Sequence, residues 1–103
     1  MKEEKNKRRA LRYARKAQRL YKRKKYDKSQ GYFLKSLRIL EPLANENPQT
    51  LEAVYADVCY KYAVSRGGDV GRFKKAYYLA LRHPDDEACK KIVADLFWLF
   101  GEK

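Results

Sequence analysis

The side chains of this 103-residue sequence that could do chemistry gather in two places. Near the C-terminus, the segment His83-Pro84-Asp85-Asp86-Glu87 is followed by Cys89 and holds the only histidine of the sequence. Near the N-terminus, lysines and arginines recur through residues 2–28 with few acids among them. The first group has the residue types of a metal or thiol site, and the second has those of an anion-binding surface.

The string His83-Pro84-Asp85-Asp86 resembles the zinc-ligand motif of the PIG-L-type N-acetylglucosamine deacetylases. The resemblance implies a histidine and an aspartate as zinc ligands and a neighbouring aspartate as base, yet that family needs a later histidine ligand and a far longer chain. In the other interpretation, Pro84 opens a helix and the acids after it complement the helix dipole, which accounts for every residue. We therefore expect no metal site and no cofactor.

The two cysteines predict no reactive thiol. Cys59 and Cys89 are not spaced as a CxxC pair, so they indicate neither a metal knuckle nor a disulfide framework. Cys89 falls on the apolar side of its helix, where a thiol stays packed and protonated. A thiol nucleophile with His83 as base would also need an oxyanion donor and a substrate pocket, and the sequence supplies neither. We expect that the protein is not an enzyme.

The glycine-rich segment Arg66-Gly67-Gly68-Asp69-Val70-Gly71 could cradle a phosphate between Arg66 and Arg72. It lacks the Lys-Ser/Thr ending of a P-loop and the GxGxxG spacing of a dinucleotide site, and no strand precedes it. A flexible turn between two helices is the favoured interpretation.

The charge of the chain is concentrated in its first quarter. The whole sequence holds 25 Lys plus Arg against 13 Asp plus Glu, a formal net charge of +12. Residues 1–28 hold 14 basic and 3 acidic side chains, whereas residues 29–103 hold 11 basic and 10 acidic ones. With 45% apolar and 14% aromatic residues the chain should fold, and its charge favours anionic partners.

The basic segment carries the pattern of an amphipathic helix. Small and apolar residues recur at steps of three and four and so share one helix face: Ala10, Tyr13, Ala14, Ala17, Leu20 and Tyr21. Cations fill the rest of the circumference: Arg8, Arg9, Arg12, Arg15, Lys16, Arg19, Lys22 and Arg23. We predict a helix over residues 8–25 whose apolar side docks on the domain and whose cations face outward. Residues 1–7 could be disordered.

The rest of the sequence predicts further helices with short connections. Asp27 or Ser29 could cap a second helix, which Pro42 ends or kinks. The segment Asn47-Pro48-Gln49-Thr50 places a cap before Leu51 in a third helix, and a fourth helix follows the glycine-rich segment and stops at His83. The fifth helix is predicted to begin at Pro84, directly after His83.

No stretch of the chain alternates strictly between apolar and polar residues, as a half-buried strand would. We therefore expect a single all-α domain over residues 1–103. Its five or so helices would form either a short array of helical hairpins or an irregular helical bundle.

The segment Lys24-Lys25-Tyr26-Asp27-Lys28-Ser29, with Ala17 before it and Phe33 and Ser36 after it, resembles a tetratricopeptide repeat. Asn47-Pro48-Gln49-Thr50 is similar to the junction between such repeats. A weaker second copy follows, so that the match covers about residues 10–83. The resemblance implies a right-handed stack of helical hairpins, a concave side that binds an extended peptide, and a last helix that acts as a solvating cap.

The last predicted helix is unlike an ordinary cap because the run Leu96-Phe97-Trp98-Leu99-Phe100 is apolar all round. Four of these residues could form a dimer interface or a partner surface: Leu96, Phe97, Trp98 and Phe100. Most of the nine tyrosines fall on apolar stripes. Tyr60 and Tyr78 lie off these stripes, and exposed aromatics among cations are what base stacking uses.

These patterns favour a small basic adaptor that binds nucleic acid, RNA before DNA, through phosphate contacts of its first helix. The alternative is a protein-interaction module of tetratricopeptide type that binds an acidic protein, with the C-terminal aromatic helix as the dimer or partner surface. The first helix has no large apolar wedge apart from Leu11 and Leu20, so we expect no membrane binding. We expect a cytoplasmic protein.

Overall fold

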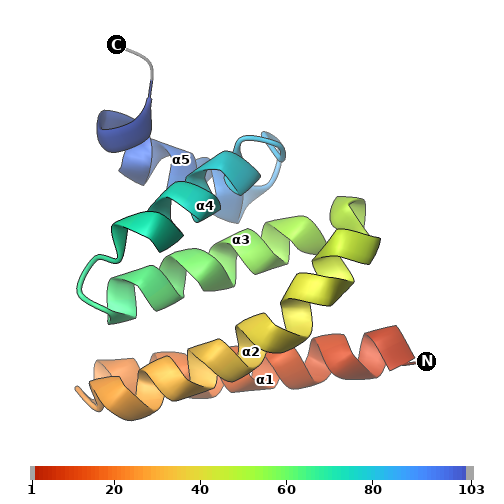
Figure 1. Ribbon diagram of the computed structural model, residues 1–103, viewed down its shortest axis with the longest axis vertical. Helices are drawn as coiled ribbons and strands as arrows, with labels where there is room; N and C mark the ends of the chain where they lie inside the picture. The colour runs from red at the N-terminus through yellow and green to blue at the C-terminus, as the bar shows by residue number, and fades with distance from the viewer. Residues whose placement is uncertain (1, 102–103) are drawn as a thin grey trace.

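The structure is a computed structural model that describes residues 2–101, and within that range it holds five α-helices and no strand. The expected all-α class is thereby confirmed. Figure 1 shows the helices in chain order: α1 (Lys2–Lys22), α2 (Tyr26–Glu46), α3 (Pro48–Ser65), α4 (Val70–Ala80) and α5 (Glu87–Phe100). None of these helices is long and apolar enough to span a bilayer.

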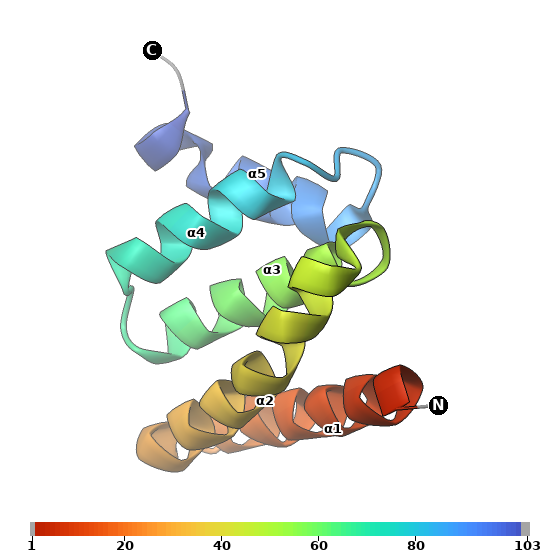
Figure 2. The ribbon, with the colours of Figure 1, turned by 45° about the vertical axis from the view of Figure 1, so that its right-hand side comes forward.

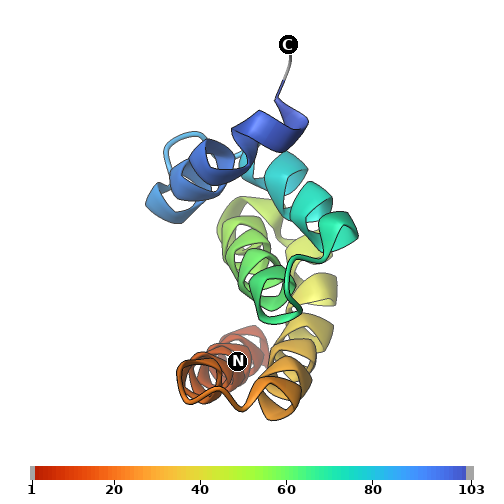
Figure 3. The same cartoon turned by 90° about the vertical axis from the view of Figure 1, so that its left-hand side faces the viewer.

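The molecule measures 41 × 34 × 20 Å. Consecutive helices form hairpins that stack along its longest dimension. Figures 1 and 2 place α1 and α2 at one end, α3 in the middle, and α4 and α5 at the other end. Seen from the side in Figure 3, α1, α3 and α5 form one layer, and α2 and α4 form the other. The central helix α3 packs against all four others, which explains why it is buried on most of its circumference.

The α1–α2 hairpin is held together by small side chains. Ala10 and Ala17 of α1 are fully buried against α2. Two buried serines of α2 cross the interface: the Ser29 hydroxyl donates to the Ala17 carbonyl at 2.7 Å, and the Ser36 hydroxyl donates to the Ala10 carbonyl at 2.8 Å. Because both pairs are seven residues apart, the same contact repeats after two turns and fixes the register of the hairpin.

The remainder of the core is built from larger side chains. Residues of α2 and α3, among them Phe33, Leu40, Leu51 and Tyr55, pack between the two layers. The C-terminal helices complete the core with Ala76, Tyr77, Ala80, Cys89, Ile92 and Leu96. The larger buried side chains of the core therefore come from α2 to α5, and α1 contributes only alanines to the fully buried set.

Helix α1 differs from the sequence prediction at both ends. It begins at Lys2, six residues before the predicted start, and ends at Lys22, three residues before the predicted end. Residues 2–7, for which disorder was an option, are helical, and Met1 lies outside the described residues.

The start and course of α2 differ as well. Neither Asp27 nor Ser29 caps this helix, because it begins at Tyr26 and makes no side-chain cap hydrogen bond. Helix α2 continues through Pro42 to Glu46 and bends in its last third, as Figure 1 shows. We expected Pro42 either to end the helix or to kink it. The structure shows that the helix is kinked and does not end there.

Boundaries in the C-terminal half also depart from the prediction. Helix α4 ends at Ala80, three residues before the predicted end. Helix α5 begins at Glu87, so the prediction that Pro84 opens it is wrong. The Asp86 carboxylate instead caps this helix by accepting a hydrogen bond from the backbone N–H of Cys89 at 3.0 Å.

The predicted cap of α3 is not formed. Asn47 directly precedes this helix, but its side chain makes no cap hydrogen bond. Its amide instead donates to the Glu3 carboxylate of α1 at 3.0 Å. The residue therefore joins the start of α1 to the connection between α2 and α3.

Candidate nucleic-acid interface

The cations predicted to form a site lie together on the outer face of α1 and in the residue directly after it. All eight are exposed, while Ala10 and Ala17 on the opposite side of the helix are fully buried. The docking that was expected of this helix is therefore present, and it leaves the positive charge in contact with solvent. We call this surface the cationic face and define it by Arg8, Arg9, Arg12, Arg15, Lys16, Arg19, Lys22 and Arg23.

Within residues 2–101, every ion pair lies outside α1. The acids that form these pairs belong to α2, α3, the α3–α4 connection and α5: Glu41, Glu52, Asp57, Asp69 and Glu87. The cationic face consequently keeps its own repulsion. Arg8 faces Arg12 and Arg12 faces Lys16 one turn further on, and each such pair destabilises a helix by roughly 0.2–0.5 kcal/mol.

A pair of tyrosines lies beside the cationic face, where α1 packs on α2. The ring centroids of Tyr13 and Tyr32 are 5.9 Å apart. The Lys16 ammonium is 4.5 Å from the Tyr32 centroid, and the Lys35 ammonium lies 4.9 Å from Tyr32 and 5.6 Å from Tyr13. We call these four residues the tyrosine–lysine cluster.

The cluster has a positive electrostatic environment. The hydrogen bond from Lys16, followed by its charge and the charges of Lys35 and Lys28, lowers the pKa of the Tyr32 hydroxyl from its usual value, while burial opposes the shift. The charges with the largest effect on this hydroxyl are cationic. The cluster therefore extends the positive surface of α1 onto α2.

The tyrosines predicted as stacking candidates are placed elsewhere. The Tyr60 hydroxyl donates to Asp95 at 2.9 Å, and burial together with that hydrogen bond raises the pKa of Tyr60 to about 12. Tyr78 is exposed but packs edge-on against Tyr77 in α4. Neither ring belongs to the hairpin that carries the cationic face.

The sequence holds a signal for the tyrosine–lysine cluster that is separate from the apolar stripes. On α1, Arg9 precedes Tyr13 by four residues and Lys16 follows it by three. On α2, a lysine precedes Tyr32 by four residues and Lys35 follows it by three. Residues at these spacings are neighbours on one helix face, so each ring lies between two cations of its own helix.

The predicted C-terminal surface is divided between core and solvent. Leu96 is buried at 5% exposure, and Phe100 is half-buried with its ring centroid 5.6 Å from that of Tyr77. Of the four residues predicted to form this surface, only Phe97 and Trp98 are well exposed, at 55% and 73%. Beside them, an apolar groove of about 490 Å³ runs between the end of α4 and α5.

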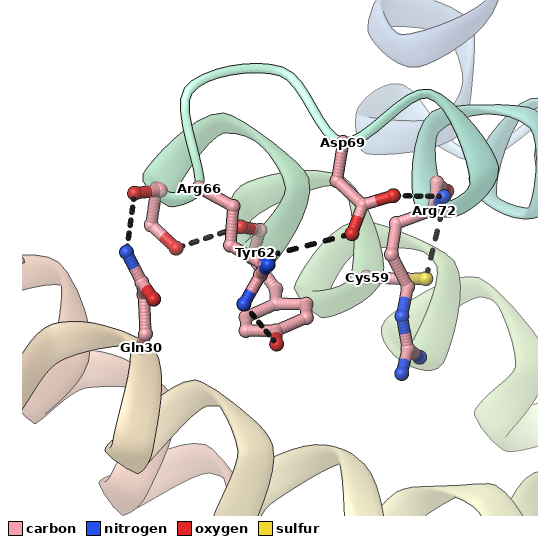
Figure 4. A network of polar contacts seen from close by, with 7 residues as sticks. Gln30, Cys59, Tyr62, Arg66, Asp69 and Arg72 are labelled. Atoms are coloured by element: carbon pink, nitrogen blue, oxygen red, sulfur yellow. Dashed lines mark hydrogen bonds and ion pairs between the residues drawn. The ribbon is translucent and has the colours of Figure 1, made fainter. Parts of the chain in front are cut away.

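The glycine-rich segment forms the turn between α3 and α4, as Figure 4 shows. The Asp69 carboxylate occupies the N-terminus of α4 by accepting from the Arg72 N–H at 3.2 Å and pairs with Arg66 at 3.4 Å. Both arginines also lie over the Tyr62 ring, at 5.8 and 5.3 Å from its centroid. An anion would have to displace the aspartate from this position.

The segment around His83 is held by structural contacts. His83 Nε2 and Arg82 Nε lie 3.0 and 3.2 Å from the same oxygen of Glu52, a side chain of α3. Cys89 is fully buried, and burial followed by the nearby Asp86 raises the pKa of its thiol to about 12. Residues 2–101 contain no group of three His, Cys, Asp or Glu side chains placed to bind a metal ion.

A wider groove of about 900 Å³ lies between α1, α3 and α5. Its polar side chains carry both signs of charge, and several are already satisfied: Lys61 pairs with Asp57 at 3.0 Å, and Tyr60 bonds Asp95. This groove opens on the opposite edge of α1 from Tyr13, with Gln18 on its wall. It therefore lacks the one-sided charge of the cationic face.

The resemblance to tetratricopeptide repeats stays a prediction. Helices that pack as successive hairpins fit such an array, but they equally fit an irregular bundle. Comparisons with protein-family models, with curated proteins and with solved structures found no match to this chain.

Proposed function

We propose that the protein binds nucleic acid, RNA before DNA, through phosphate contacts of the cationic face. The observation that carries the proposal is the exposure of its eight cations along a helix that forms no ion pair within residues 2–101. A face whose charges repel one another and meet no carboxylate gains most from a polyanion.

The dimensions of α1 suit a phosphate backbone. A helix of 21 residues is about 30 Å long, which spans several phosphates along a strand. If six side chains met phosphates, the logarithm of the affinity would fall against the logarithm of salt with a slope of about −5 on a B-form duplex and about −4 on a single strand.

The contacts would position the protein on the backbone without reading sequence. Reading adenine in a major groove requires an Asn or Gln side chain, and the cationic face has neither, since the amide of Gln18 lines the groove away from it. A face of lysines and arginines with no Asn or Gln among them is unlike a major-groove recognition helix, which is the reason for placing RNA before DNA.

The test is a fluorescence-anisotropy titration of labelled RNA at low and high salt. The triple variant Arg12→Glu, Lys16→Glu, Arg19→Glu should abolish binding. A matched triple on exposed lysines of α4 and α5, Lys74→Glu, Lys90→Glu and Lys91→Glu, changes the net charge equally and should leave most of the affinity. The proposal fails if the first triple binds as the wild type does or if the two triples weaken binding equally.

An acidic protein is the competing ligand of the same face. Polyglutamate offers the charge of a phosphate backbone without its spacing or its bases, so it serves as a competitor in the same titration. If polyglutamate displaces the RNA at an equal concentration of charges, the interaction-module alternative is favoured over nucleic-acid binding.

Exposure of Phe97 and Trp98 favours a second activity, self-association through α5. The charged residues of this helix balance, with Glu87 and Asp95 against Lys90 and Lys91, so a second copy meets no net repulsion. The cationic face lies at the other end of the molecule (Figure 1). Sedimentation over a range of concentrations should reveal a dimer that Trp98→Ala weakens, and a monomer at every concentration would contradict it.

A further inference from the structure

The tyrosine–lysine cluster is anchored on both sides by the contacts that fix the α1–α2 hairpin. Tyr13 lies between Ala10 and Ala17 on α1, and Tyr32 lies between Ser29 and Ser36 on α2. The two serine-to-carbonyl hydrogen bonds, at 2.7 and 2.8 Å, therefore bracket the tyrosine pair. The rings are held on a rigid scaffold, so little order has to be imposed when a ligand arrives.

Four cations surround the pair in a repeated arrangement. Each tyrosine has a cation four residues before it and another three residues after it on the same helix face: Arg9 and Lys16 around Tyr13, Lys28 and Lys35 around Tyr32. All four of these side chains are exposed. None of them forms an ion pair within residues 2–101.

Aromatic rings framed by cations match a ligand that is both flat and anionic. A nucleobase provides a π-face that stacks on tyrosine, and its flanking phosphates provide charges that lysine and arginine neutralise. Lysines now lie over the rings, but an exposed ammonium–tyrosine contact is weaker than a base–tyrosine stack. A base can therefore displace an ammonium, which then reaches a neighbouring phosphate.

We propose that the cluster is a stacking site for single-stranded nucleic acid, in which bases stack on the Tyr13–Tyr32 pair and Arg9, Lys16, Lys28 and Lys35 hold the flanking phosphates. The inference rests on the proposed function, since it names the form of nucleic acid that the cationic face takes. A duplex keeps its bases stacked inside and gains only from the cations, and an acidic peptide brings no flat ring.

The experiment compares three labelled probes at one salt concentration: a short oligouridine, the same RNA annealed to its complement, and an abasic strand with the same number of phosphates. The wild-type protein should bind the oligouridine roughly 5- to 150-fold more tightly than the abasic strand, which is the range expected for one stacked base. This comparison uses the native chain and does not depend on how a variant folds.

Ring-removing variants locate the effect. Tyr13→Leu keeps a good helix former on α1 and should lose the preference for oligouridine over the abasic strand, whereas Tyr32→Phe keeps the ring and should retain it. Tyr78→Leu removes an exposed ring of α4 and serves as the matched control that changes nothing. Thermal melting of each variant confirms that α1 stays docked.

The outcomes separate this inference from the proposed function. Equal binding of the abasic strand, the single strand and the duplex overturns the stacking site and leaves phosphate binding by the cationic face standing. The stacking site is also overturned if Tyr78→Leu loses the preference for oligouridine while Tyr13→Leu retains it. Failure of all three probes to bind at low salt overturns the proposed function itself.

Discussion

Helix α1 and the α3–α5 part of the molecule differ in whether their cations are paired with carboxylates. In α3–α5, cations meet carboxylates, as Lys61 meets Asp57 and Arg82 meets Glu52. On α1, the cations form no ion pair within residues 2–101 and leave their repulsion unrelieved. The difference shows that acids are available to the chain and are not placed where the positive charge is greatest.

The two regions also pack differently. The C-terminal helices bury aromatic and branched side chains such as Tyr77 and Ile92. Helix α1 contributes alanines, which bury little apolar area, and the serine hydroxyls of α2 supply the contact. The hairpin is therefore held by close approach of two backbones, and its stability depends on keeping the small residues small.

The largest effect we expect comes from breaking that close approach. Ala17→Leu adds a side chain where Ala17 is fully buried under Ser29, and overpacking of this kind destabilises a protein by about 3 kcal/mol. Urea unfolding followed by circular dichroism measures the loss. Ala94→Leu, the same substitution at an exposed position of α5, should change the free energy of unfolding by less than about 0.5 kcal/mol. Equal effects of the two substitutions would show that α1 is not tightly docked.

The next effect is confined to the C-terminal region and appears at alkaline pH. Burial, and then Asp86, raises the pKa of the Cys89 thiol from 9.0 to about 12, so the folded state keeps a proton that the unfolded state loses. The stability contributed by the protonated thiol is complete below about pH 9 and is lost as the pH rises toward 12. Melting temperature should fall over that interval, and a thiol reagent at pH 8 should leave Cys89 unmodified in the folded protein. Rapid modification at pH 8 would contradict the burial.

The helices and their polarity could be predicted from the sequence because a repeat of three and four residues is a local property. The fully buried Ala10 and Ala17 and the exposed arginines follow directly from it. The start of α5 was placed wrongly because two local rules compete there. The preference of proline for the first turn pointed to Pro84, and the side-chain cap by Asp86 prevailed.

The candidate site could be predicted only in part, because half of it depends on a contact between helices. The periodicity put Tyr13 on the apolar seam of α1 but gave no partner for it. The pairing with Tyr32 depends on the hairpin register, which the Ser29 and Ser36 hydroxyls set. Likewise, a helix that is apolar all round does not reveal that Leu96 faces the core while Trp98 faces solvent.

Replacement of an arginine by glutamate should change the free energy of unfolding in opposite directions in the two regions. Arg82→Glu removes the ion pair of the nearly buried Glu52 and places a like charge beside it, which should destabilise the fold by about 1–2 kcal/mol. Arg12→Glu replaces repulsion with Arg8 and Lys16 by attraction and should stabilise the fold by about 1 kcal/mol.

Measurement of both variants by urea unfolding and by RNA titration sharpens the comparison. Arg12→Glu should fold more stably and bind RNA more weakly, because the charge that destabilises α1 is the charge that meets phosphate. If Arg12→Glu lowers the stability as Arg82→Glu does, the cations of α1 are compensated within the fold and the contrast between the regions disappears.

The smallest effect concerns the turns that end α1 and α3, which have the same hydrogen bonds but different residues at the left-handed position. Lys25 N–H donates to the Leu20 carbonyl at 2.9 Å, as Gly68 N–H donates to the Ala63 carbonyl at 3.0 Å. The residue directly before the donor is in the left-handed conformation in both turns. It is Lys24 at φ 62° in the first turn and Gly67 at φ 77° in the second.

A side chain at positive φ is strained, so Lys24→Gly should stabilise the fold by about 0.5–1 kcal/mol, and Gly67→Ala should destabilise it by about as much. Thermal melting distinguishes these small shifts. Lys24→Gly should also weaken RNA binding slightly and make the salt slope less steep by about one phosphate contact, because the turn loses a cation beside the cationic face. A stabilised variant with unchanged RNA affinity would place this lysine outside the interface and restrict the binding surface to α1 and the tyrosine–lysine cluster.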